Sequence, residues 1–270
     1  KRNDGFHDLE TCFYPLPFYD VLEIISAPAT AEKAEYDLSF STTGIPLSIT
    51  DENNSCLRAI QLVRQKFPGR LPAMQVHLHK NIPAGAGLGG GSADGAFTLT
   101  LLNKLYRLGQ ATDELAALAL QLGSDCPFFI YNKPCYATGR GEIMEPVPLD
   151  LSAYRLILIN PGIHISTAAA FEKIKLGVPK HTVKDIIKQP IETWKHHLQN
   201  DFELPVFHLY PEIMAVRDQL YAQGAVYAAM SGTGSTVYGI FSNTAPSPAL
   251  SFPAHYFIRQ TDSLPPSHSF

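Results

Sequence analysis

Apolar and polar residues alternate in two segments near the start of the chain, which is the pattern of a strand with one buried face. The two segments are residues 19–27 (YDVLEIISA) and residues 74–80 (MQVHLHK). Residues 36–50 (YDLSFSTTGIPLSIT) carry apolar residues on both sides of a Thr-Thr-Gly sequence, so we expect two short strands joined by a turn. These patterns predict a sheet in the first third of the chain.

Apolar residues at helical spacing occur in three further segments. In residues 54–67 (NSCLRAIQLVRQKF), four apolar side chains recur so that they share one face of a helix. Residues 92–108 (SADGAFTLTLLNKLYRL) have the same period, and Gly109 can end that helix. Residues 112–122 (TDELAALALQL) predict another helix directly afterwards, and residues 135–147 (CYATGRGEIMEPV) predict a hairpin.

The second half of the chain mixes strands and helices in a different order. Residues 155–160 (RLILIN) predict a buried strand, and residues 211–220 (PEIMAVRDQL) predict a helix. Residues 225–241 (AVYAAMSGTGSTVYGIF) have the pattern strand, glycine turn, strand, and residues 254–259 (AHYFIR) predict a last strand. Between the halves, residues 146–154 (PVPLDLSAY) are typical of a linker.

The predicted elements do not follow a steady βαβ alternation, so we expect an α+β fold. The linker places a boundary near residues 146–152, which gives one domain at residues 1–148 and a second at residues 149–270. A chain of 270 residues, 45% of them hydrophobic, is long enough to bury a core in each.

Charge and cysteine content argue against several classes of protein. The net charge is −4, so no basic excess indicates a nucleic acid or an anionic membrane as partner. No apolar run reaches the roughly 18 residues that a membrane-spanning helix needs. The four cysteines form no CxxC pair and no zinc-site cluster with the histidines. We therefore expect a reduced, cytoplasmic protein.

The predicted strand at residues 74–80 leads into the sequence PAGAGLGGGSADG, which has six glycines between Gly85 and Gly95. A strand, a glycine-rich turn and a helix start can form a phosphate-binding site, because the first amides of a helix lack internal partners and the helix dipole adds positive charge. Ser92 is expected where the helix begins, and there it would cap the helix or contact a phosphate or Mg²⁺.

Two common nucleotide-binding motifs fit this stretch incompletely. Gly85, Gly87 and Gly90 satisfy the fingerprint G-x-G-x-x-G, but the predicted helix is followed by another helix rather than by a second parallel strand. A Walker loop requires Lys where this chain has Gly91. A glycine-rich turn with a purely structural role is the remaining alternative.

Four segments together resemble one superfamily. Residues 82–96 (IPAGAGLGGGSADGA) resemble the signature P-x-x-x-G-L-G-S/G-S-S/A of the GHMP kinases. Residues 1–24 resemble the segment R-P-D-G-Y/F-H-E-L-x-T of the members that act on 4-diphosphocytidyl-2-C-methyl-D-erythritol. Residues 123–129 (GSDCPFF) resemble their G-A/S-D-V-P-F-F, and residues 231–241 (SGTGSTVYGIF) resemble their S-G-S/T-G-S/A-x-V-F. The motifs occur in the expected order.

The resemblance implies an ATP-dependent kinase with the two-domain GHMP kinase fold. A ribosomal-protein-S5-like N-terminal domain with a left-handed crossover would bind ATP, and a ferredoxin-like C-terminal domain would bind the substrate. The γ-phosphoryl group would pass to the 2-hydroxyl of the cytidyl diphosphate of methylerythritol, in the non-mevalonate isoprenoid pathway. Mg²⁺ would accompany the nucleotide without a metal site made by the protein alone. The resemblance implies a monomer or weak dimer without a nucleic-acid or membrane partner.

Individual roles follow from the matched motifs. By resemblance, Asp125 is the catalytic base; the alternative is an Asx turn that only closes the preceding helix. Phe6 and His7 match contacts to cytosine, Phe171 matches a second stacking aromatic from the other domain, and Thr167 matches a nearby polar contact. The alternatives are a core position for Phe171 and a surface position for His7.

The resemblance also assigns the nucleotide contacts. Lys80 and Asn54 match positions near the adenine and ribose, and both are equally compatible with a solvated surface. The turn with Gly232 and Gly234 is expected to face the phosphates or the substrate, or to be a simple hairpin. The phosphates would lie against Pro83, Ala84, Gly85, Ala86, Gly87, Leu88, Gly89, Gly90, Gly91, Ser92 and Ala93.

Members of the family carry a segment A-K-I-N-L upstream of the D-G-F-H motif, and its Lys stabilises the transferring phosphoryl group. The sequence printed above begins at Lys1, which does not match that Lys, and a chain with nothing upstream is expected to have very low activity. Two other functions compete with the kinase described above. One is a GHMP kinase acting on a different small alcohol, and the other is a nucleotide-binding protein without catalytic activity.

Overall fold

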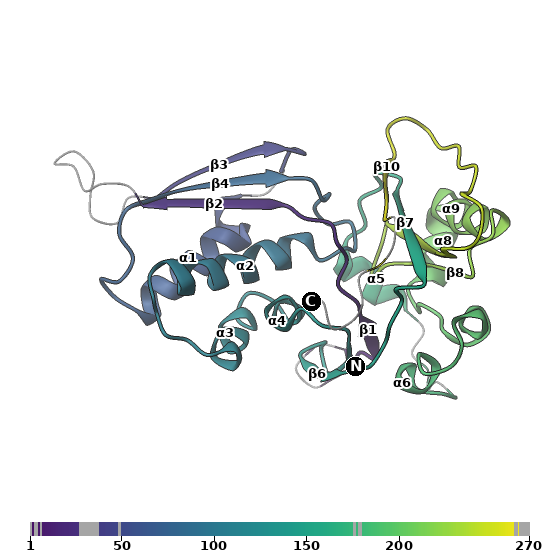
Figure 1. Ribbon diagram of the computed structural model, residues 1–270, viewed down its shortest axis with the longest axis horizontal. Coiled ribbons are helices and arrows are strands. Elements are labelled where there is room, and N and C mark those ends of the chain that lie inside the picture. Colours follow the sequence, from purple (N-terminus) through teal and green to yellow (C-terminus); the bar gives the residue numbers. More distant parts are fainter. Residues whose placement is uncertain are drawn as a thin grey trace.

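The computed structural model describes residues 2, 5, 7–26, 38–47, 50–174, 177, 180–261 and 264. In this part of the chain, two sheets lie side by side, each with helices packed against one face, and a third, smaller sheet lies near their junction (Figure 1). The first sheet comes from the N-terminal half and the second from the C-terminal half. The predicted α+β class is confirmed.

The N-terminal sheet has the strand order β2-β4-β3, with a crossover between its last two strands in sequence. β2 (Val21–Ser26) is antiparallel to β4 (Met74–Lys80), whereas β3 (Leu38–Gly44) is parallel to it. A parallel pair requires a long connection. Here the connection contains the short 3₁₀ helix η1 (Asp51–Asn53) and helix α1 (Ser55–Lys66).

The turn predicted within residues 36–50 is wrong, because residues 42–44 lie inside β3 and pair with the end of β4. The parallel partner supplies ladder hydrogen bonds that the local sequence does not reveal. The chain turns only after the glycine that ends β3, where the amide of Ile45 donates to the carbonyl of Lys80 at 2.9 Å. Residues 48–49, in the second predicted strand, lie outside the described residues.

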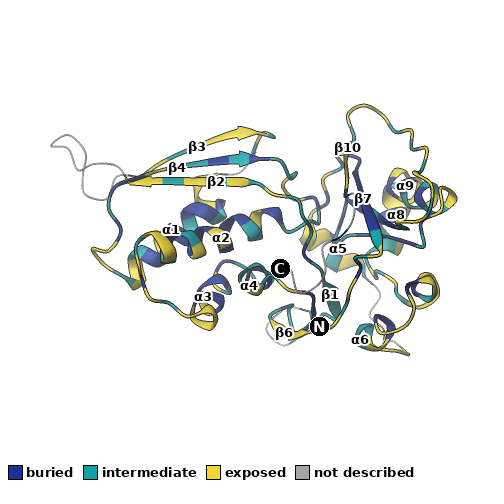
Figure 2. Ribbon diagram, in the orientation of Figure 1, coloured by how far each residue is buried: buried dark blue, intermediate teal, exposed yellow. Residues whose placement is uncertain are grey.

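Helices α1 and α2 (Gly90–Leu105) cover one face of the N-terminal sheet, with α3 (Thr112–Ala119) and α4 (Cys126–Tyr131) beyond them (Figures 1 and 2). Burial follows the predicted periodicity in α1. The face predicted for α2 is wrong, because it included Phe97 and Leu105, which are 43% and 47% exposed, whereas Leu99 and Leu102 are fully buried. The six-residue α4 was not predicted, because an apolar run this short has no diagnostic period. The core between sheet and helices includes Met74, Val76, Ile60, Val63, Leu99 and Leu102.

The small sheet joins the beginning of the chain to the predicted hairpin. β1 (Thr11–Phe13) pairs with β5 (Cys135–Thr138), which pairs with β6 (Ile143–Pro146), all antiparallel. One apolar cluster beside it contains Val147 on one side of the predicted domain boundary and Leu156 on the other. The two halves of the molecule therefore share buried apolar surface.

The C-terminal sheet has the order β10-β7-β9-β8, which is the strand order of a ferredoxin-like domain. Its strands are β7 (Tyr154–Asn160), β8 (Tyr227–Met230), β9 (Val237–Ser242) and β10 (Phe257–Gln260). A complete ferredoxin-like repeat has a helix between its last two strands, but residues 243–256 form none. Three prolines in these residues disfavour a helix there.

The connection from β7 to β8 contains all the helices of the C-terminal half that the structure describes. No described helix is long and apolar enough to cross a bilayer. The connection contains α5 (Thr167–Lys173), α6 (Val183–Ile186), η2 (Ile191–Thr193), α7 (Trp194–His197), α8 (Glu203–Leu209) and α9 (Pro211–Ala222).

Candidate active site

The glycine-rich loop, residues 83–89, connects β4 to α2 as predicted. Gly85, Gly87 and Gly89 have φ values of +65°, +76° and +67°, a region that residues with a side chain rarely adopt. Helix α2 begins at Gly90, so Ser92 lies within its first turn rather than at the predicted cap. A Cβ at Gly91 would meet no atom within 4 Å. The start of this 16-residue helix is therefore open at that position.

The late glycine turn, residues 231–236, forms the hairpin between β8 and β9 and also contacts the glycine-rich loop. The Ser231 hydroxyl donates to the carbonyl of Gly87 at 2.7 Å, and the amide of Thr236 donates to the carbonyl of Ala86 at 3.1 Å. A Cβ at Gly87 would lie 2.1 Å from the carbonyl oxygen of Ser231. Both proposed roles of this turn, as a hairpin and as a neighbour of the phosphate-binding loop, are thus compatible with the structure.

Asp125 lies at the N-terminal end of α4, next to the last residue of the glycine-rich loop. Its Oδ2 atom would be 3.9 Å from a Cβ at Gly89. Its side chain does not cap α4, and among the described residues none donates a hydrogen bond to the carboxylate. Burial, and then the charge of Asp125, raise the pKa of the neighbouring Cys126 thiol to about 12, so the thiol stays neutral. The carboxylate is the group here that can accept a proton.

Two residues predicted to contact the cytosine come together from segments that are distant in the sequence. The rings of His7 and Phe171 stack with their centroids 5.1 Å apart and their planes at 17°. Phe202 packs edge-on against Phe171, with a centroid distance of 4.8 Å. Thr167, the first residue of α5, is exposed. Phe6, the remaining residue of this set, lies outside the described residues.

Family models match both halves of the chain. The model described as GHMP kinases N terminal domain matches residues 54–133, and the model described as GHMP kinases C terminal matches residues 182–255. A 4-diphosphocytidyl-2-C-methyl-D-erythritol kinase from Azobacteroides pseudotrichonymphae is 47% identical over 260 residues, covering 96% of this chain and 94% of the relative. This chain belongs to that family of GHMP kinases.

Further comparisons agree with this family. The enzyme of the same name from Bacteroides fragilis is 46% identical and covers 90% of this chain and 86% of its own length. A crystal structure of 4-(cytidine 5'-diphospho)-2C-methyl-D-erythritol kinase is similar with a TM-score of 0.72 at 31% identity, covering 88% of this chain and 83% of that chain. A homoserine kinase structure from Cytophaga hutchinsonii, at 14% identity and a TM-score of 0.63, covers 90% and 87% of the two chains and shares the fold.

Two nucleotide contacts assigned from the family motif are not surface residues. The side chain of Lys80 is only 1% exposed, and its ammonium contacts the carboxylates of Asp20 and Asp94. Asn54 is also buried, and its side-chain oxygen caps α1 by accepting hydrogen bonds from the amides of Cys56 and Leu57. The solvated-surface alternative is wrong for both, because each side chain has a structural partner inside the N-terminal domain.

Two asparagines that support the late glycine turn were not predicted from the sequence. Asn160 Nδ2 donates to the hydroxyls of Ser235 and Thr236, at 3.2 and 2.9 Å. Asn200 Nδ2 donates to the carbonyls of Met230 and Gly232, both at 2.8 Å. The one available signal was Asn160, a polar residue that ends an otherwise apolar strand.

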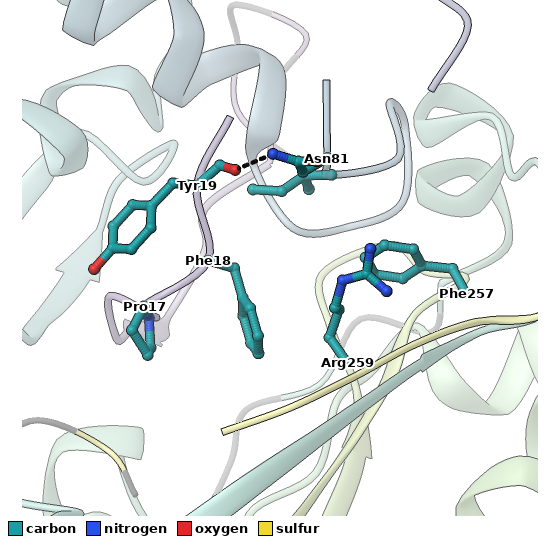
Figure 3. Close-up of a pocket in the computed structure, with 7 residues that line it drawn as sticks. Pro17, Phe18, Tyr19, Asn81, Phe257 and Arg259 are labelled. Carbon is teal, nitrogen blue, oxygen red and sulfur yellow. Dashed lines mark hydrogen bonds between the residues drawn. The ribbon is translucent and has the colours of Figure 1, made fainter. Parts of the chain in front are cut away.

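A cavity of about 200 Å³ lies against the segment that leads into the glycine-rich loop (Figure 3). None of the predicted site residues lines it. Its walls come from the segment before β2, from the residues after β4 and from β10. The lining residues are Pro17, Phe18, Tyr19, Asn81, Ile82, Phe257 and Arg259.

Proposed function

We propose that this protein transfers the γ-phosphoryl group of ATP to the 2-hydroxyl of 4-diphosphocytidyl-2-C-methyl-D-erythritol, with ADP and the 2-phosphate as products. The observation that carries the proposal is the position of Asp125, whose carboxylate faces Gly89 at the end of the glycine-rich loop. A base beside a phosphate-binding loop is what an alcohol kinase requires. Identity to kinases of this name over nearly the whole chain supports the choice of substrate.

The glycine-rich loop would hold the ATP phosphates with main-chain amides. The first N–H groups of α2 have no partner within the helix, and the helix dipole favours negative charge at this end. Open space at Gly91 allows phosphate oxygens to approach the backbone. These donors also stabilise the charge that develops on the transferring phosphoryl group.

Mg²⁺ would enter with the nucleotide. The described residues contain no group of three or more His, Cys, Asp or Glu side chains that could hold a metal alone. An ion that is coordinated largely by phosphate oxygens does not need such a group. It would neutralise the charge of those oxygens. Ser92, in the first turn of α2, is the hydroxyl of the loop sequence that could contribute a ligand.

Asp125 would act as the general base. As the substrate oxygen bonds to phosphorus, its proton passes to the carboxylate, which no described residue occupies with a hydrogen bond. The base also orients the hydroxyl, and in phosphoryl transfer such orientation accounts for much of the catalysis.

His7 and Phe171 would hold the cytosine ring between them. Two stacking contacts of about 3.5 Å each require a centroid separation of about 7 Å. The rings are 5.1 Å apart in this structure, so they must separate by about 2 Å for the base to enter. Thr167 lies on α5 four residues before Phe171 and would provide a polar contact.

We place the reaction in the cytoplasm. All four cysteines are free thiols, the state expected in a reducing compartment.

The test is an ADP-release assay on the full-length protein with ATP and 4-diphosphocytidyl-2-C-methyl-D-erythritol. ADP release that depends on this alcohol and is competed by free cytidine diphosphate supports the proposal. Release with another small alcohol, unaffected by cytidine diphosphate, would indicate a different GHMP kinase. ATP binding without release would indicate a non-catalytic protein.

The Asp125→Asn variant tests the base separately. It should bind ATP normally and lose nearly all turnover, because an amide cannot accept the proton. Near-normal turnover would remove Asp125 from this role.

A further inference from the structure

Beneath the glycine-rich loop, three charged side chains form a buried cluster, which we call the charge triad: Lys80, Asp20 and Asp94. The side chains of the two acids are 5% and 9% exposed, and that of the lysine is 1% exposed. Lys80 Nζ donates to Asp94 Oδ2 at 2.7 Å and contacts Asp20 Oδ2. Three charges are thus withdrawn from water in one place. The cost of removing them from water is offset only where the contacts between them are close and well aligned.

The charge triad connects three segments that are distant in the sequence. Lys80 ends β4, Asp94 lies in the second turn of α2, and Asp20 precedes β2. The second oxygen of Asp20 accepts hydrogen bonds from the amides of Asn81 and Ile82, at 2.6 and 3.0 Å. The three segments therefore cannot move relative to one another without breaking charged contacts.

Further contacts tie the charge triad to both ends of the glycine-rich loop. The Asn81 side chain donates to the carbonyl of Tyr19 at 3.0 Å, as the dashed line in Figure 3 shows. Ile82, whose amide the triad holds, immediately precedes the loop. At its other end, a Cβ at Gly90 would lie 3.1 Å from Cγ2 of Ile82 and 3.6 Å from Nζ of Lys80. The loop thus begins and ends against the same cluster.

We propose that the charge triad is a positioning device that fixes the span of the glycine-rich loop, and so aims the amides of α2 at the nucleotide phosphates, without touching the nucleotide itself. Lys80 is then a positioning residue rather than a ligand of adenine or ribose. This inference rests on the proposed use of the loop for ATP. It assigns functions to Asp20 and Asp94, which carry no part of the proposed phosphoryl transfer.

The direction in which one substitution changes the affinity for ATP separates positioning from a direct electrostatic effect. Asp94→Asn removes a negative charge and keeps the shape and an acceptor for Lys80. If Asp94 acted on ATP only through its charge, its loss would strengthen the binding of the anionic nucleotide. If Asp94 positions the loop, its loss weakens ATP binding, because the charged contact that holds α2 to β4 becomes weaker.

The experiment measures the affinity of wild type, Lys80→Met and Asp94→Asn for ATP and for adenosine by calorimetry. We expect both variants to bind ATP at least about tenfold more weakly, since small displacements of positioning groups have large effects. Adenosine affinity should stay within about twofold, less than the loss of one hydrogen bond. KM for the cytidyl substrate should not change. Lys104→Met, an exposed substitution on α2, is the matched control.

Three results would overturn the inference. Tighter or unchanged ATP binding in Asp94→Asn would contradict positioning, and this variant decides the question if Lys80→Met does not fold. Equal losses of ATP and adenosine affinity in Lys80→Met would make Lys80 a direct ligand of the nucleoside. Additive losses of ATP affinity in a variant that combines Lys80→Met with Asp94→Asn would show that the two residues do not act as one unit. Because ATP binding is measured without the alcohol, these outcomes are separate from failure of the proposed reaction.

Discussion

At the scale of single residues, the motifs predicted the site better than they predicted the environment of each side chain. Asp125, His7 and Phe171 could be assigned because each lies within a matched segment. The burial of Lys80 could not, since its partners Asp20 and Asp94 are 60 and 14 residues away in the sequence. Gly95 is similar: a Cβ there would lie 2.9 Å from Cβ of Ser55, a contact between two helices that periodicity does not specify.

Two glycines of the loop sequence should respond oppositely to alanine. Gly87→Ala should destabilise the fold by at least about 1–3 kcal/mol, because its positive φ is strained for alanine and the Cβ would strike the carbonyl of Ser231. Gly91→Ala should preserve or raise stability by up to about 1 kcal/mol through helix propensity, yet weaken ATP binding. Urea unfolding and ATP titration of both variants check this. Equal stability losses would contradict the geometry at Gly91.

The buried Asp94 should make stability depend on pH. Burial raises the pKa of its carboxyl from 3.8 to about 6, although Lys80 opposes this shift. Between these values the folded state binds more protons than the unfolded state, so the unfolding free energy falls as pH rises through this window. Asp94→Asn should therefore gain stability relative to wild type, by about 2 kcal/mol, between about pH 4.5 and pH 7.

Urea titrations of wild type and Asp94→Asn at these two pH values measure the difference. Asp51→Asn, at an exposed carboxylate, should show no comparable gain. If Asp94→Asn instead loses stability relative to wild type as pH rises, the pKa of Asp94 is lowered in the folded protein rather than raised.

At the scale of elements, regular periodicity was informative and contacts between distant segments were not. Helices α1, α2, α3 and α9 and the strands of the C-terminal sheet follow their predicted segments. The turn wrongly predicted within β3 depends on pairing with the parallel strand β4, which is distant in the sequence. Helix α4 was not predicted because it is a short apolar run without a diagnostic period. Neither could be found from local propensity alone.

The late glycine turn gives a prediction at this scale. Asn200→Ala should cost about 1–2 kcal/mol, because it removes hydrogen bonds to the carbonyls of Met230 and Gly232 and one from the amide of Phe202. It should also raise KM for ATP, since Ser231 links this turn to the glycine-rich loop. Asn243→Ala removes a similar bond, to the carbonyl of Ser152, at an exposed position and should leave KM unchanged. A normal KM in Asn200→Ala would separate the turn from nucleotide binding.

At the scale of the whole molecule, the two halves are joined by more than a linker. The apolar cluster that includes Val147 and Leu156 also holds Trp194, the single tryptophan of the chain, with Tyr14 and Tyr136 packed against it. The division at residues 148 and 149 stays a prediction. The shared cluster could not be predicted from sequence, because it assembles residues from both halves.

This cluster predicts cooperative unfolding. Trp194 fluorescence should change in the same urea transition as the helical circular dichroism, since the buried surface shared by both halves couples them. Val147→Ala, at the junction, should lower both midpoints together. Two separated transitions in wild type would mean that the halves unfold independently.

The most direct test of the kinase is the identity of its product. Full-length protein should be incubated with ATP and 4-diphosphocytidyl-2-C-methyl-D-erythritol and the products followed by ³¹P NMR. The account predicts a new phosphomonoester on the 2-hydroxyl, formed in equal amount with ADP, and neither product from Asp125→Asn. Phosphate on another hydroxyl, or ADP formed without a phosphorylated alcohol, would contradict it.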